Sequence, residues 1–89
     1  MQHRATTDFW QHYHALSHEV RGRADKQFLL LKANPQHPSL QFKKVGERHG
    51  NEIWSARVSL NYRALAIKRP DGYLWFWVGD HKDYESLIS

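Results

Sequence analysis

The second half of the chain has the pattern of a small antiparallel sheet. From Ile53 to Leu60, apolar and polar residues alternate with the period of a strand that has one apolar face. Tyr62 to Lys68 forms a second strand candidate, and the turn signal Pro70-Asp71-Gly72 leads into a third, Tyr73 to Val78. These three segments predict consecutive strands that pair with their neighbours.

The third strand candidate is apolar on both faces. By alternation, one face carries Tyr73, Trp75 and Trp77 and the other carries Leu74, Phe76 and Val78. A strand of this kind belongs in the middle of a sheet, or between helices on one side and a binding surface on the other. Upstream, Leu40 to Val45 is a short strand candidate that precedes a polar turn from Gly46 to Asn51. We therefore expect a sheet of three to four strands.

The first half of the chain is helical in pattern. Thr7 can cap a helix that opens at Asp8, and apolar residues then recur at helical spacing, at Phe9, Tyr13, Leu16 and Val20. Ser17 interrupts the pattern, which predicts either a second helix capped by Ser17 or one kinked helix. The stripe continues to Ala33, where the following Asn34-Pro35 stops the helix. Two antiparallel helices packed as a hairpin fit this pattern best.

The tail from Lys82 to Ile88 has room for one or two helical turns, which would tuck Leu87 and Ile88 onto the core. The expected fold class is α+β: an N-terminal helical hairpin packed on a small antiparallel sheet of three to four strands, with a short C-terminal helix. At 89 residues the chain is predicted to be a single domain, 1–89.

Composition limits the function classes. Without cysteine, the chain has neither disulfides nor zinc–cysteine sites. Since no apolar run approaches the roughly 18 residues of a membrane span and no secretory signal is evident, we expect a cytoplasmic protein.

Positive charge concentrates in the sheet half. Between residues 38 and 69 two acids face seven basic residues, which are Lys43, Lys44, Arg48, Arg57, Arg63, Lys68 and Arg69. A basic face indicates an anionic partner, such as nucleic acid or an acidic protein segment. The alternative is a solvated face without function.

Two arginines are candidates for phosphate binding. Arg57 points to the polar face of its strand by alternation, and Arg63 lies one short turn later on the neighbouring strand. Arginine binds phosphate with a planar fork of donors and stays charged, which suits stabilisation of a pentacoordinate phosphorus. Alternatively, each arginine pairs with an acid such as Glu52 or Asp80.

A histidine and a tyrosine follow the last strand. His81 follows Gly79 at the C-terminal end of the last strand, and site residues often gather at such strand ends. Histidine moves protons near neutral pH. Tyr84 shares its side if the tail is helical. The alternative is a surface histidine that caps the turn. His14 and His18 have the i, i+4 spacing of metal ligands, but no third ligand is evident, so no metal is predicted.

Lys43 and Lys44 lie beside Phe42, a basic and aromatic combination typical of surfaces that contact RNA. A lysine pair on an edge strand also protects a sheet against aggregation. The tryptophans of the sheet half are expected to be core or partner-binding residues rather than base-stacking platforms.

With these residues placed, the chain resembles the RelE/ParE superfamily of toxins from bacterial type II toxin–antitoxin modules. The resemblance covers roughly Phe9 to Ile88. It is carried by the order of the helical hairpin, NPQHPSLQFKKVG, WSARVSLNYRALAI and WFWVGDHKDYESLI, and by the Tyr62-Arg63 pair.

The resemblance implies a RelE-like endoribonuclease, an mRNA interferase that represses translation by cleaving mRNA on the ribosome. In that chemistry the ribose 2′-hydroxyl attacks the adjacent phosphorus without a metal or other cofactor. Arg63 and Arg57 match the residues that stabilise the phosphate, and His81 and Tyr84 match those that handle protons or orient the nucleotide. Lys43 and Lys44 would dock ribosomal RNA. A cognate antitoxin would cover the basic sheet face and the hairpin.

Two departures keep other functions open. Superfamily members usually begin with a strand, but only Met1 to Thr6 precede the first helix here, so this strand is expected to be short or missing. Ser55 stands where several of the nucleases carry a charged catalytic residue. The alternatives are a non-catalytic ParE-like toxin that binds DNA gyrase and a degenerate relative that only binds an antitoxin.

Overall fold

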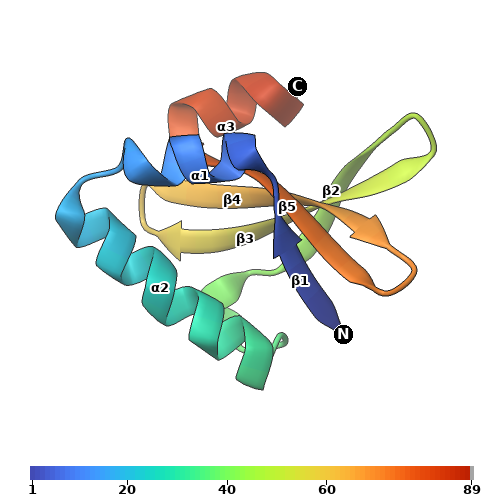
Figure 1. Ribbon diagram of the computed structural model, residues 1–89, viewed down its shortest axis with the longest axis horizontal. Helices are drawn as coiled ribbons and strands as arrows, with labels where there is room; N and C mark the ends of the chain where they lie inside the picture. Colours follow the sequence, from blue (N-terminus) through green and yellow to red (C-terminus); the bar gives the residue numbers. More distant parts are fainter. Residues whose placement is uncertain (89) are drawn as a thin grey trace.

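A computed structural model describes residues 1–88 as three helices and one five-stranded sheet (Figure 1). The elements are β1 (Gln2–Ala5), α1 (Thr7–His14), α2 (His18–Ala33), the 3₁₀ turn η1 (Pro38–Leu40), β2 (Lys43–Arg48), β3 (Asn51–Ser59), β4 (Tyr62–Arg69), β5 (Gly72–Asp80) and α3 (His81–Ile88). The strand order is β1-β5-β4-β3-β2, with β1 parallel to β5 and every other pair antiparallel. The α+β class is confirmed, with one strand more than predicted and with a mixed sheet. None of the helices in residues 1–88 is long and apolar enough to cross a membrane.

The helical hairpin forms as predicted, with its break at Ser17. The Ser17 hydroxyl accepts a hydrogen bond from the Val20 amide at 3.2 Å, which caps α2. Helix α2 ends at Ala33, before the Asn34-Pro35 stop signal. The first cap is Thr6 rather than the predicted Thr7. The Tyr13 hydroxyl donates to Asp25 at 2.6 Å and ties α1 to α2.

The N-terminal strand is present, although short. Residues Gln2 to Ala5 pair in register with Gly72 to Trp75, and Arg4 forms an ion pair with Asp71 at 3.3 Å. The close approach requires Gly72, because a Cβ there would lie 1.8 Å from the Gln2 carbonyl oxygen. Its pairing partner lies 70 positions away, so local pattern alone gave no sign of β1.

The substitution Gly72→Ala should therefore destabilise the fold by about 2 kcal/mol or more, because neither backbone can move away without breaking the β1–β5 pairing. Gly22→Ala is the matched control. A Cβ at Gly22 meets nothing within 4 Å, and alanine favours a helix, so this change should stabilise by about 0.5–1 kcal/mol. Urea unfolding measures both; equal effects of the two substitutions would contradict the close approach.

His3 anchors β1 to the core through its neutral ring. The Trp75 indole N–H donates to His3 Nδ1 at 3.1 Å, and the His3 ring stacks on Tyr73 with centroids 5.8 Å apart. Since an indole nitrogen only donates, Nδ1 must be unprotonated in this bond. Burial lowers the pKa of His3, and the positive charges of the N-terminus and Lys32 lower it further.

A lowered His3 pKa in the folded state means that the unfolded chain binds the proton more readily. The stability from neutral His3 is complete above the ordinary histidine pKa and is lost as the pH falls from there through the lowered pKa of the folded state. The urea concentration at the midpoint of unfolding should therefore be lower for the wild-type protein at about pH 5.5 than at about pH 7.5. His3→Gln keeps an acceptor for Trp75 and should reduce this difference. The exposed control His18→Gln should retain it; an unchanged difference in His3→Gln would refute the assignment.

A β-bulge at Phe76 changes the faces of β5. Leu65 pairs with Trp77 whereas the next residue, Ala66, pairs with Trp75, so β5 carries one extra residue between these pairs. The prediction that Trp75 and Trp77 share a face was therefore wrong. Trp75 packs under the helical hairpin and Trp77 packs toward α3. Strict alternation cannot reveal a bulge.

Each face of the sheet carries its own hydrophobic cluster. The hairpin face holds Leu31, Leu40, Ala56, Val58, Ala64, Ala66, Tyr73, Trp75 and Val78, and the α3 face holds Ile53, Leu65, Trp77 and Tyr84. The tail prediction was wrong in detail. Leu87 and Ile88 remain 38% and 40% exposed, and Tyr84 is the residue of α3 that packs on the sheet, at 5% exposed.

Strand β2, the first strand of the sheet half, begins later than predicted. Leu40 lies in η1 and is fully buried, β2 starts at Lys43, and the turn consists of His49 and Gly50, both with positive φ. The predicted polar turn from Gly46 is therefore mostly strand.

Candidate functional site

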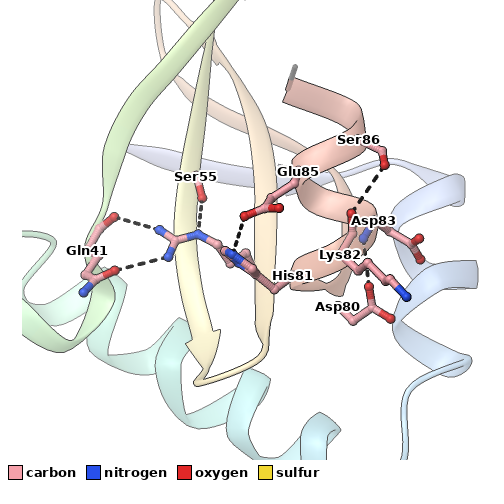
Figure 2. Close-up of polar contacts among 9 residues, drawn as sticks. Gln41, Ser55, Asp80, His81, Lys82, Asp83, Glu85 and Ser86 are labelled. Carbon is pink, nitrogen blue, oxygen red and sulfur yellow. Dashed lines mark hydrogen bonds and ion pairs between the residues drawn. The ribbon is translucent and has the colours of Figure 1, made fainter.

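Arg63 is a buried cation in the middle of the sheet. Its side chain is on the α3 face of β4 and is 8% exposed. Its Nε donates to Ser55 Oγ on β3 at 2.8 Å, and its Nη1 and Nη2 donate to Gln41 Oε1 and to the Gln41 carbonyl oxygen at 3.2 and 3.3 Å (Figure 2). All three acceptors are uncharged. The ring of Tyr84 lies 5.2 Å from the guanidinium carbon.

Arg57 is the cross-strand partner of Arg63, as the sequence predicted for the two guanidiniums. Burial lowers the pKa of Arg63; Tyr84 acts to raise this pKa, and the like charge of Arg57 lowers it further. Within residues 1–88, neither arginine forms an ion pair with an acidic side chain. The predicted alternative, pairing with Glu52 or Asp80, is therefore wrong. Two adjacent cations without counter-charge favour an anionic ligand.

Helix α3 places Tyr84 and His81 beside Arg63. The helix begins where Asp80 Oδ1 accepts from the Asp83 amide at 2.9 Å, which is an N-cap contact. The His81 ring lies 5.7 Å from the Tyr84 ring, so Tyr84 touches both His81 and Arg63. The imidazole is half-exposed, and its Nε2 lies 2.8 Å from Glu85 Oε1 (Figure 2). Nδ1 of His81 has no partner among the described residues.

The two predicted RNA-docking lysines point to opposite faces. Lys43 pairs in register with Ser55, which places it on the same face as Arg63. Lys44 pairs with Trp54 on the hairpin face and forms an ion pair with Glu47 at 2.6 Å. Only Lys43 therefore joins the cationic group, and the roles assigned to both lysines stay predictions. We call Lys43, Arg57, Arg63, His81 and Tyr84 the α3-face cluster.

Two cavities lie near the sheet, and Arg57 is the one member of this cluster that lines either of them among the described residues. One of about 330 Å³ lies between the hairpin and the sheet and is mostly apolar, with Phe9, Trp10, Phe28 and Trp75 among its walls. The other, about 530 Å³, opens beside α1 and α3. Neither is lined by Arg63 or His81.

The structure also separates the histidines that had metal-ligand spacing. His14 ends α1 and His18 begins α2, so the two do not share one helical face. No group of three histidine, cysteine, aspartate or glutamate side chains in the described part of the chain is placed to hold a metal ion.

Comparison with known proteins identifies the family. Residues 18–86 match the profile of the ParE-like toxin domain. The chain belongs to the ParE-like toxin family. A comparison with curated protein sequences finds no significant match.

Solved toxin structures share the fold of this ParE-like domain. The RelB–RelE antitoxin–toxin complex from Methanococcus jannaschii superposes with a TM-score of 0.71 at 15% identity, covering 97% of this chain and 99% of the other. For the RelE–RelB complex from Pyrococcus horikoshii OT3 the TM-score is 0.67 at 11% identity, with 89% and 92% covered. The YoeB/ParE toxin from Agrobacterium tumefaciens gives 0.66 at 14%, with 91% and 99% covered. The expected RelE/ParE resemblance is confirmed.

Sequence reasoning missed the residues that hold Arg63 and His81 in this ParE-like domain. Ser55 had been noted as a departure from the nucleases, but its bond to Arg63 was not foreseen, and neither Gln41 nor Glu85 was singled out. The spacing of Glu85, four residues after His81 on a helix, was a usable signal. Gln41 gave none, because its contact with Arg63 spans 22 positions of sequence.

Ser55→Ala should destabilise this ParE-like domain by about 1.5–3 kcal/mol, because it leaves the charged Nε–H of Arg63 buried without an acceptor. The matched control is Ser59→Ala on the same strand, whose hydroxyl has no hydrogen bond among the described residues, with an expected effect within about 0.5 kcal/mol. Urea unfolding compares the two. Equal effects would mean that the Ser55–Arg63 bond contributes no net stability.

Proposed function

We propose that this protein is the toxin of a type II toxin–antitoxin module and cleaves mRNA on the ribosome in the manner of RelE. The observation that carries this proposal is the α3-face cluster, where Arg57 and Arg63 lie side by side without counter-charge and a half-exposed His81 lies across the Tyr84 ring. A backbone phosphate supplies the missing negative charge, and an accessible imidazole supplies the proton transfer.

The chemistry assigns each group a step. The 2′-hydroxyl gives up its proton as its oxygen bonds to the adjacent phosphorus, and the bond from phosphorus to the 5′-oxygen breaks. The products are a 2′,3′-cyclic phosphate and a 5′-hydroxyl, whose oxygen takes up a proton. Arg57 and Arg63 stabilise the charge that develops on the phosphoryl oxygens. His81 is the group of the cluster suited to move a proton to or from a ribose oxygen, with Glu85 fixing its ring. Tyr84 holds the imidazole and the guanidinium apart at a fixed spacing.

A cognate antitoxin is the second partner we propose. The solved archaeal relatives were crystallised as RelE–RelB complexes. Here the apolar cavity between the hairpin and the sheet and the unpaired cations of the other face fit an amphipathic segment with acidic residues.

A non-catalytic toxin that binds DNA gyrase is the second candidate. Two observations favour it: the matching profile is that of ParE-like domains, and Ser55 is engaged by Arg63 instead of supplying a charged catalytic group. In that case Arg63 is a structural residue, and the basic face is a docking surface.

Inducible expression followed by mapping of mRNA 5′ ends separates the two functions. Wild-type protein should arrest growth and create new mRNA ends. His81→Gln should lower cleavage by at least about 100-fold, the usual contribution of acid–base catalysis. Arg57→Gln should also lower it, because half of the paired charge on the phosphate is lost.

The controls are His18→Gln and Arg23→Gln, which remove the same residue types from the exposed surface of α2 and should leave cleavage unchanged. Growth arrest without new mRNA ends, equally strong in the His81 and Arg57 variants, would refute the nuclease. Accompanying DNA breaks would then support gyrase as the target.

A further inference from the structure

Gln41 occupies the outer edge of the Arg63 guanidinium. Its two oxygens accept from Nη1 and Nη2 at 3.2 and 3.3 Å, and Ser55 takes the Nε–H from another side (Figure 2). The paired Nη atoms are the fork with which arginine binds two oxygens of a phosphate or carboxylate. Gln41 is exposed whereas Arg63 is 8% exposed, so Gln41 stands between the cation and solvent.

The contact is weak for a charged donor. Charge-assisted bonds from arginine to an anion are typically about 2.7–2.9 Å long, shorter than both Gln41 contacts. Both acceptors are neutral, and neighbouring Arg57 adds a second positive charge. A phosphate would present the same two-oxygen geometry together with negative charge, so it competes with Gln41 on favourable terms.

The residues on either side of Gln41 are anchored by packing. Gln41 has φ 43° and ψ 43°, the left-handed region that costs a residue with a Cβ about 1 kcal/mol or more. Leu40 before it is fully buried, and the Phe42 ring after it packs 5.0 Å from Trp54. Oε1 can therefore leave Arg63 by side-chain rotation, and the carbonyl oxygen by rotation of the Gln41–Phe42 peptide, while the Leu40 and Phe42 side chains stay packed.

We propose that Gln41 is a gate residue: it closes the Nη edge of Arg63 in the free protein, and a phosphodiester or phosphate anion opens the site by displacing its two oxygens. This inference rests on the proposed function, because it adds a control of anion affinity to the same site.

Two substitutions at Gln41 give opposite predictions. Gln41→Glu places a carboxylate on the Nη edge and locks the gate with an ion pair, whereas Gln41→Gly removes Oε1 and relieves the left-handed strain. The control is Gln36→Glu, an exposed glutamine in the same loop whose side chain has no partner among residues 1–88. It makes the same change in net charge without touching Arg63.

The experiment is a titration with inorganic phosphate, followed by the NMR resonance of the Arg63 Nε–H group. Gln41→Gly should lower the apparent dissociation constant about three- to tenfold, and Gln41→Glu should raise it about tenfold, as expected for losing or strengthening a hydrogen bond to a charged group. Gln36→Glu should stay within about twofold of wild type. Thermal unfolding of each variant verifies that it is folded.

Weaker phosphate binding by Gln41→Gly would overturn the gate and make Gln41 a residue that positions Arg63. Equal affinities in all variants would also overturn it. Gln41→Asn provides a second opening variant, because asparagine tolerates the left-handed region and its carbonyl is one methylene short of Arg63; it should also bind more tightly. If the affinities follow the expected order without mRNA cleavage, the gate stands and the nuclease proposal fails. Cleavage with equal affinities gives the reverse conclusion.

Discussion

The structure depends on keeping one positive charge buried without an opposite charge. Arg63 is 8% exposed, yet its contacts are a hydroxyl, an amide oxygen, a carbonyl oxygen and an aromatic ring. These groups accept a hydrogen bond from each of its three nitrogens but leave its charge uncompensated, which is a costly arrangement in a low-dielectric interior. The contacts join β4 to β3, to the loop before β2 and to α3, so the same side chain organises one face of the sheet and makes it receptive to anions.

The two faces of the sheet differ in composition: one holds most of the apolar core and the other holds the cations. The hairpin face holds most of the apolar burial and is closed by β1 through the neutral His3–Trp75 pair. The opposite face has a smaller cluster, which leaves room for the cations. Gly79 contributes to this division, because a Cβ there would lie 2.5 Å from the Trp77 ring.

Local sequence signals located most elements, and the larger errors share one physical origin. Capping at Ser17 and the proline stop after Ala33 act within a few residues, and the structure follows them. The β1–β5 pairing, the bulge at Phe76 and the contact of Gln41 with Arg63 are non-local, so no pattern along the chain reports them. The candidate site follows the same rule. Strand alternation predicts where the side chains of Arg57 and Arg63 lie, whereas the partners that hold Arg63 come from distant segments. Lys43 and Lys44 are neighbours in sequence, but because side chains alternate along a strand they lie on opposite faces of the sheet.

A crystal structure of the protein with a short RNA carrying a 2′-deoxy substitution at the cleavage position tests the central claim most directly. We expect a backbone phosphate bound by the guanidiniums of Arg57 and Arg63, Gln41 turned away, and the His81 imidazole within hydrogen-bond reach of a ribose oxygen. RNA bound on another face, with Arg63 still held by Gln41, would show that the buried cation serves the fold alone.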